Sequence, residues 1–144
     1  MEDMKEEIIN YLSKRKFMTL ATTHNDKPLT HPVAYINKGP ILYFSTSNQT
    51  RKAKSIKENP NVAYSVYERT EHLDEIINVQ MEGEASIVEN IDETGEIIEM
   101  LKTKFPTMSK MTMDTDSVVI KITPKICYYT DYTKGFGSRE KVEF

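Results

Sequence analysis

Residues 30–62, THPVAYINKGPILYFSTSNQTRKAKSIKENPNV, contain the change of pattern that decides the fold. Two short runs rich in β-branched and aromatic residues, 29–37 and 41–47, are separated by a glycine and a proline and indicate two strands joined by a turn. Arg51 then opens a basic, helix-like segment that Pro60 closes. The stretch therefore predicts a strand, a turn, a second strand and a basic helix.

The junction between the second strand and the basic helix has the features of an anion site. A helix start offers unpaired backbone N–H groups and the positive end of a dipole. Ser47 or Asn48 is the expected cap, which places Arg51 and Lys52 in about the first turn. The same residues also fit a solvated helix face whose lysines point into water, so local sequence alone leaves both interpretations open.

The flanking sequence adds further strands and two more helices. Alternating apolar residues predict strands, and apolar residues at helical spacing predict helices. Asn90 fits the cap of a capping box, and Gly83 indicates a bulge or a close backbone approach inside a strand. The expected strands are 17–24, 61–68, 77–89 and 117–132, the last one long strand or two joined near Pro124; the expected helices are 3–15 and 92–103, with a loop at 107–116 and a glycine-bearing tail at 134–144.

About six strands and three helices without regular βαβ alternation predict a mainly β fold with peripheral helices. The expected architecture is an antiparallel sheet of six strands that is closed or nearly closed into a barrel. At 144 residues, the chain has the size of one ordinary domain, so we expect a single domain over 1–144.

Composition excludes several classes of function. The net charge is −3 and no basic tract is longer than the three residues 14–16, so nucleic acid is not an expected partner. The single cysteine, Cys127, allows no internal disulfide and suits a reducing cytoplasm. The scattered histidines do not form a metal-binding motif. Neither a signal-type segment nor an apolar run near the ~18 residues of a membrane span is present, which predicts a cytoplasmic protein with no membrane partner.

The order of the motifs resembles a known family, the FMN-binding split β-barrel of the pyridoxamine 5'-phosphate oxidase-like superfamily (FMN, flavin mononucleotide). The resemblance runs from Phe17 to Arg139, is most specific over 30–62, and is greatest to the short members linked to general stress. It implies a six-stranded antiparallel split β-barrel and an FMN cofactor. It also favours the anion site over the solvated helix face.

The resemblance implies specific cofactor contacts. Arg51 and Lys52 match the family's phosphate-binding pair, and Tyr129 falls where the family often has a tryptophan beside the flavin. Asn78 takes the place of a flavin-contacting glutamine. The cofactor-binding residues that the resemblance implies are Thr30, His31, Pro32, Val33, Ala34, Tyr35, Ser45, Thr46, Arg51, Lys52, Asn78, Tyr129 and Arg139.

Three of these contacts have an alternative explanation in the sequence. Tyr129 also fits simple packing in a strand, Arg139 also fits a solvated charge in the tail, and His31 also fits a surface histidine. Thr30 and Tyr35 stand where true oxidases have arginine and lysine, and the chain has no tryptophan, so oxidation of pyridoxamine phosphate itself is not expected. No side chain is assigned as a catalytic acid or base.

The resemblance also implies a homodimer with FMN between the subunits, in which Tyr129 and Arg139 come from the subunit opposite Arg51. The leading functional hypothesis is an FMN-dependent oxidoreductase that acts on a small molecule, with NAD(P)H as a candidate electron donor. The alternatives are a flavin-binding module that takes part in a stress response without turnover, and a split barrel that binds haem or a deazaflavin.

Overall fold

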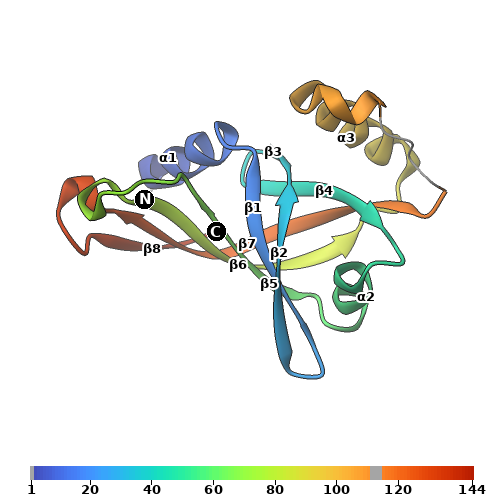
Figure 1. Cartoon of the computed structure of the whole chain (residues 1–144), viewed down its shortest axis with the longest axis horizontal. Coiled ribbons are helices and arrows are strands. Elements are labelled where there is room, and N and C mark those ends of the chain that lie inside the picture. The colour runs from blue at the N-terminus through green and yellow to red at the C-terminus, as the bar shows by residue number, and fades with distance from the viewer. Residues whose placement is uncertain (1, 111–114) are drawn as a thin grey trace.

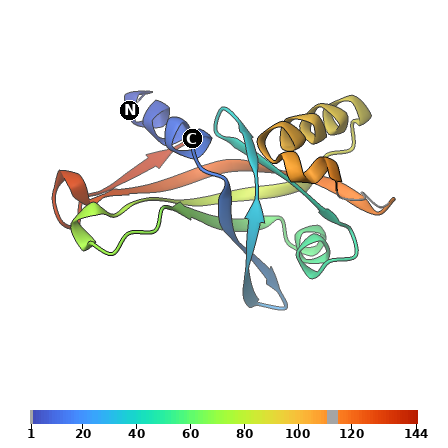
Figure 2. The same ribbon diagram turned by 45° about the horizontal axis from the view of Figure 1, so that its top comes forward.

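The strands form one antiparallel sheet that curls into a half-barrel (Figures 1 and 2). The computed structural model describes residues 2–110 and 115–144. The strands are β1 (Phe17–His24), β2 (Lys27–Ala34), β3 (Ile36–Lys38), β4 (Ile41–Ser47), β5 (Asn61–Tyr67), β6 (Ile77–Ile87), β7 (Ser117–Asp131) and β8 (Arg139–Glu143). Their order across the sheet is β2-β1-β5-β6-β7-β4-β3, and β8 pairs with β7.

Within residues 2–110 and 115–144, three α-helices and three 3-10 helices accompany the sheet. None of the helices in the described part of the chain is long and apolar enough to cross a bilayer. The helices are α1 (Glu2–Ser13), α2 (Arg51–Glu58), α3 (Ile91–Lys104), η1 (Leu73–Glu75), η2 (Pro106–Lys110) and η3 (Tyr132–Lys134).

The predicted mainly β, antiparallel split barrel is confirmed, but the predicted count of six strands is wrong, because the described residues form eight. The run predicted at 29–37 breaks at Tyr35 into β2 and β3, and part of the expected tail pairs with β7 as β8. Since β2 and β3 are opposite edges of the sheet, the chain crosses from edge to edge at Tyr35, where the barrel is split. Residues 111–114 of the predicted loop lie outside the described residues.

Two apolar clusters fill the two sides of the sheet. The larger lies inside the half-barrel, where α1 packs onto the inner faces of the strands. The smaller lies under α3 and holds Ile97 and Leu101 of that helix against Val119 of β7. Both faces of β7 are therefore buried near its start; toward its end Tyr128 is partly exposed, whereas Tyr129, Thr130 and Asp131 are all buried.

A bulge between β6 and β7 changes which residues of β7 face the interior. Glu82 pairs with Ile126 but Gly83 pairs with Pro124, so Lys125 is the extra residue. A Cβ atom at Gly83 would lie 2.6 Å from the carbonyl oxygen of Thr123, which explains why glycine is needed there. The bulge predicted at Gly83 is confirmed.

The β1–β2 hairpin extends past α2 (Figure 1). Its two turn residues, Asn25 and Asp26, have φ values of 50° and 61°, as the tight turns of two-residue hairpins require. The hairpin therefore brings the tip of β2 alongside the basic helix.

Candidate functional site

Helix α2 begins with a well-formed cap next to the end of β4. Thr50 is the cap: its Oγ1 accepts a hydrogen bond from the amide of Ala53 at 3.3 Å. The expectation of Ser47 or Asn48 as the cap is wrong, because the Ser47 carbonyl instead accepts bonds from Thr50, and a turn separates strand from helix. Arg51 and Lys52 are the first two helical residues, as predicted.

The start of α2 is a locally positive region. In the described ranges, neither Arg51 nor Lys52 forms an ion pair with a carboxylate. Burial lowers the pKa of Lys52, because leaving water penalises its charged form. Thr50 caps the amide of Ala53, whereas the amides of Arg51 and Lys52 have no hydrogen-bond partner in the described structure, so two cations and two N–H donors lie together at this end.

His31 of β2 belongs to the same region. Burial, and then the charges of Lys52 and Arg51, lower the pKa of His31. Its Nε2 lies 3.2 Å from Oγ1 of Thr22 on the neighbouring strand. His31 is therefore within electrostatic reach of Arg51 and Lys52 at the start of α2.

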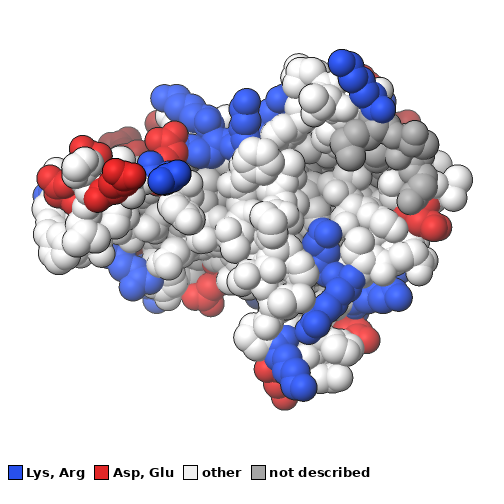
Figure 3. All heavy atoms as spheres, viewed as in Figure 1, with Lys and Arg blue, Asp and Glu red and all other residues white. Residues whose placement is uncertain are grey.

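An open cavity of about 550 Å³ lies between α2 and the tip of the β1–β2 hairpin. Lysine and arginine side chains gather over these elements in Figure 3, and those that line the cavity are Lys27, Arg51 and Lys54. The Glu58 carboxylate at its edge is paired with Nδ1 of His24 at 2.6 Å. The cavity therefore presents mainly positive charge to a ligand.

Ser45 and Thr46 lie at the end of β4, beside the cap of α2. Oγ1 of Thr46 is 3.3 Å from Oγ1 of Thr50, and both residues are partly buried. The predicted strand end is thus linked to the start of α2 through a pair of hydroxyl groups.

The segment 30–35 splits between surface and core. Val33 is nearly buried and Tyr35 fully buried, and the Tyr35 hydroxyl donates to the carbonyl of Leu12 at 2.6 Å. Their predicted role as cofactor contacts is thereby restricted to backbone atoms, because both side chains belong to the core. Pro32 is exposed and Ala34 partly so. As an edge strand, β2 has backbone groups on its free side that a ligand can reach.

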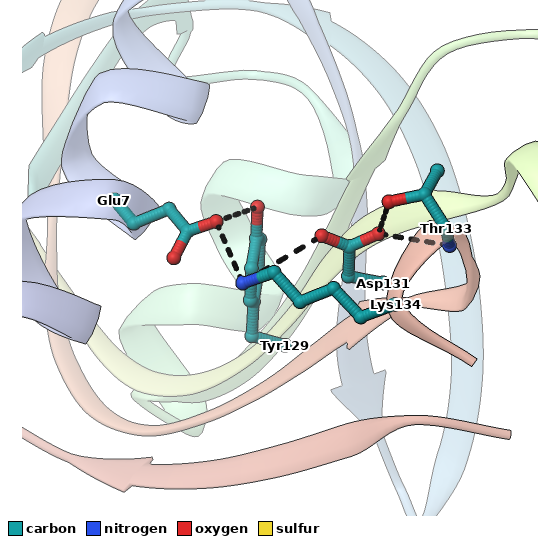
Figure 4. Close-up of polar contacts among 5 residues, drawn as sticks. All are labelled: Glu7, Tyr129, Asp131, Thr133 and Lys134. Atoms are coloured by element: carbon teal, nitrogen blue, oxygen red, sulfur yellow. Dashed lines mark hydrogen bonds and ion pairs between the residues drawn. The ribbon is translucent and has the colours of Figure 1, made fainter.

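Tyr129 packs in the interior of this chain, which is the alternative that the sequence left open, and its contact with a flavin stays a prediction. Its side chain is 4% exposed and meets the ring of Tyr11 edge-on at 6.2 Å. Figure 4 shows its hydroxyl directed at Glu7 of α1, to which it donates at 3.4 Å, with Lys134 on the same carboxylate. Asp131 joins this network through Lys134 and Thr133. Within one chain, this side chain faces the interior.

Arg139 lies on the outer face of the sheet, where sequence analysis missed two partners. Its Nη2 donates to Oε1 of Gln80 at 3.1 Å, and its guanidinium lies 4.6 Å from the ring centre of Tyr128. These residues line an open cavity of about 340 Å³ together with the predicted Thr30. This arrangement could not be predicted from simple alternation along β7. The extra residue at the bulge shifts the alternation by one position, and Tyr128 therefore faces outward.

Asn78 lies on β6 beside a third open cavity of about 510 Å³, near the end of β5. Its Oδ1 is buried and has no hydrogen-bond partner in the described structure. A buried acceptor without a donor is costly unless a ligand or water supplies one. The residue therefore fits a role in binding a group that carries an N–H or O–H donor.

Separate features of the structure suit separate parts of an FMN molecule. The start of α2 suits a phosphate, the free edge of β2 suits a ring with polar edges, and Asn78 offers an unused acceptor. Within one chain, however, Arg51, Arg139 and Asn78 line three different cavities. One chain alone does not gather all the predicted residues around one ligand.

Solved structures and curated proteins resemble this chain. General stress protein 26 of Bacillus subtilis is 34% identical over 61 residues, which cover 42% of this chain and 44% of that protein. The alignment thus spans less than half of the curated relative. The crystal structure of General Stress Protein 26 from Bacillus anthracis is 27% identical, covers 98% of both chains and has a TM-score of 0.73.

More distant structures share the fold alone. HutZ of Vibrio cholerae, described as a haem storage protein, is 19% identical with a TM-score of 0.72, over 83% of this chain and 89% of that one.

The family model for pyridoxamine 5'-phosphate oxidase matches residues 4–131. Because this match spans most of the sequence, the chain belongs to the pyridoxamine 5'-phosphate oxidase family.

Proposed function

We propose that this protein binds FMN with the phosphate at the start of α2. The observation that carries the proposal is the pair Arg51 and Lys52 in the first helical turn, with no carboxylate partner in the described part of the chain. Phosphate accepts charge-assisted hydrogen bonds from both side chains and from the unpaired amides. Thr46 and Thr50 add hydroxyl groups at the same place.

We further propose a homodimer that completes the site. Arg139, Gln80 and Tyr128 lie on the outer face of the sheet, apart from the cavity that Arg51 lines. A second copy packed on this face would supply these groups to the FMN held by the first. Analytical ultracentrifugation tests the dimer independently of cofactor binding.

The proposed activity is that of a flavin-dependent oxidoreductase acting on a small molecule, with NAD(P)H as a candidate donor. Bound FMN supplies hydride and electron transfer, and the residues of the chain bind and orient it. Thr30 and Tyr35 in place of two charged residues, and the absence of tryptophan, argue against pyridoxamine phosphate as the substrate.

A haem-binding or non-catalytic role is the second candidate. The structural neighbours that are described as binding or storing haem favour it. His31 is partly exposed, and its lowered pKa favours the neutral imidazole that ligates iron. The absorption spectrum of the purified protein separates flavin from haem. Reduction of the bound flavin by NAD(P)H, followed by reoxidation, separates an enzyme from a flavin store.

The phosphate site is tested with Arg51→Ala combined with Lys52→Ala. Each charge-assisted contact contributes about 1.5–3 kcal/mol, so the double variant is expected to weaken FMN binding by about a hundredfold or more. Isothermal titration with FMN measures the change. Lys57→Ala, which removes an exposed charge from the last turn of the same helix, is the control and is expected to bind FMN normally. An unchanged dissociation constant in the double variant would refute the site.

A further inference from the structure

A separate cavity of about 470 Å³ lies between α3, β3 and the end of α1. It shares no residue with the proposed flavin site. Its apolar lining comes from Ile36 and Met100, and its polar lining from side chains of the two helices and β3. The residues around it are Ser13, Ile36, Asn37, Glu96, Glu99, Met100, Thr103 and Lys104.

Among the described residues that line this cavity, Lys104 is the only basic one, and it has an unusual setting. Its Nζ lies 4.3 Å from the ring centre of Tyr35, which is fully buried, and 5.7 Å from that of Phe105. Among the described residues, no carboxylate forms an ion pair with it. The neighbouring Lys102, by contrast, lies 3.9 Å from the carboxylate of Glu99.

This setting raises the fraction of the amine that is uncharged. Burial, assisted by repulsion from Lys16, lowers the pKa of Lys104 to about 8. Contact with the two aromatic rings acts in the opposite direction, but it does not replace the water that the ammonium group has lost. At pH 7.5, about a quarter of such amines are uncharged, compared with about one in a thousand for an ordinary lysine. An uncharged lysine amine is a nucleophile toward carbonyl carbon.

We propose that Lys104 captures small neutral aldehydes in this cavity as imines. The amine lone pair forms a bond to the carbonyl carbon, and the carbonyl oxygen leaves as water with the two amine hydrogens. The step needs no oxidant or reductant and is reversible. The proposal goes beyond the flavin-dependent function and does not rest on it.

The lining disfavours negatively charged aldehydes. Glu96 and Glu99 place two carboxylates at the cavity, which disfavour phosphorylated or carboxylated compounds. The side-chain donors of Ser13, Asn37 and Thr103 are already engaged within the protein. Contact with Ile36 and Met100 therefore favours aldehydes with a short apolar chain.

The test is reductive trapping of the full-length protein with propanal and cyanoborohydride at pH 7.5, followed by peptide mass spectrometry. Lys104 is expected to be alkylated at least about tenfold faster than Lys102 two positions away, because burial lowers the pKa of Lys104, whereas the amine of Lys102 lies 3.9 Å from the carboxylate of Glu99. Equal labelling of the two lysines would overturn the proposal. Slower trapping of glyceraldehyde 3-phosphate than of propanal is expected, and the reverse order would overturn the assigned class.

A substitution at Lys16 tests whether the reactivity of Lys104 comes from its setting in the fold. Lys16→Gln removes an exposed charge that repels Lys104, so it is expected to raise the pKa of Lys104 and slow its labelling at pH 7.5. Labelling followed over pH should show a midpoint near 8 for Lys104 in the unmodified protein. A rate at Lys104 that is still rising steeply at pH 10 would contradict the proposal.

Discussion

Tyr128 and Tyr129 are adjacent on β7 but lie on opposite faces of the sheet. Tyr129 is 4% exposed, packs against Tyr11 and bonds to Glu7 of α1. Tyr128 lies on the outer face beneath the guanidinium of Arg139. The same side chain thus stabilises the core at one position and lines a candidate ligand or subunit surface at the next. Strand register decides which role a residue has.

Truncating each of the two tyrosines in turn tests this comparison, and we expect it to give the largest difference in unfolding free energy. Tyr129→Ala should lower the free energy of unfolding by about 3–5 kcal/mol, as for other large buried aromatic side chains. Tyr128→Ala should cost less than about 1 kcal/mol, because it is partly exposed. Urea denaturation measures both. If both variants lose a similar amount of unfolding free energy, Tyr129 does not face the core while Tyr128 faces outward, and the description of the two faces of the sheet is wrong.

The bulge that sets the two faces is tested by comparing two glycines. Gly83→Ala should destabilise the fold by about 2–3 kcal/mol, since its new methyl group would meet the backbone of Thr123. Gly95→Ala is the matched control: it lies within α3 with open space around it, and alanine there should stabilise by about 0.5–1 kcal/mol. Thermal unfolding distinguishes the two signs, and a neutral Gly83→Ala would argue against the bulge.

The smallest effect concerns β2, where Thr30 lines the outer cavity and His31 lies near Arg51 and Lys52. NMR titration of the His31 ring should give a pKa below the ordinary value of about 6.5. Removing both cations, or adding inorganic phosphate, should raise this pKa. If the pKa of His31 responds to neither change, the charges at the start of α2 do not act on His31, and the described electrostatic link is wrong.

The same shift makes stability depend on pH. Because the folded chain disfavours the charged imidazole of His31, it binds fewer protons than the unfolded chain once the pH falls below about 6.5. The contribution of His31 to stability is therefore complete above this pH and is lost as the pH falls through the folded pKa. His31→Gln should reduce this part of the pH dependence.

Much of the candidate site could be predicted from local sequence. The dipeptide Arg51-Lys52 after a strand places two cations in the first turn of a helix whichever residue caps it, and the structure has them there. Arg139 was predicted, but its neighbours Gln80 and Tyr128 were not. They lie on different strands, and only pairing across the sheet brings them together.

The sequence by itself determined the local elements: the alternating strands, the amphipathic helices, the basic start of α2 and the glycine at the bulge. These follow from side-chain period, capping and backbone freedom, which act over a few residues. The tertiary structure alone decided that Tyr129 faces inward, that the barrel is split at Tyr35 and that Lys104 lies over a buried ring. These depend on register and on contacts between distant segments, and neither is encoded in any short stretch.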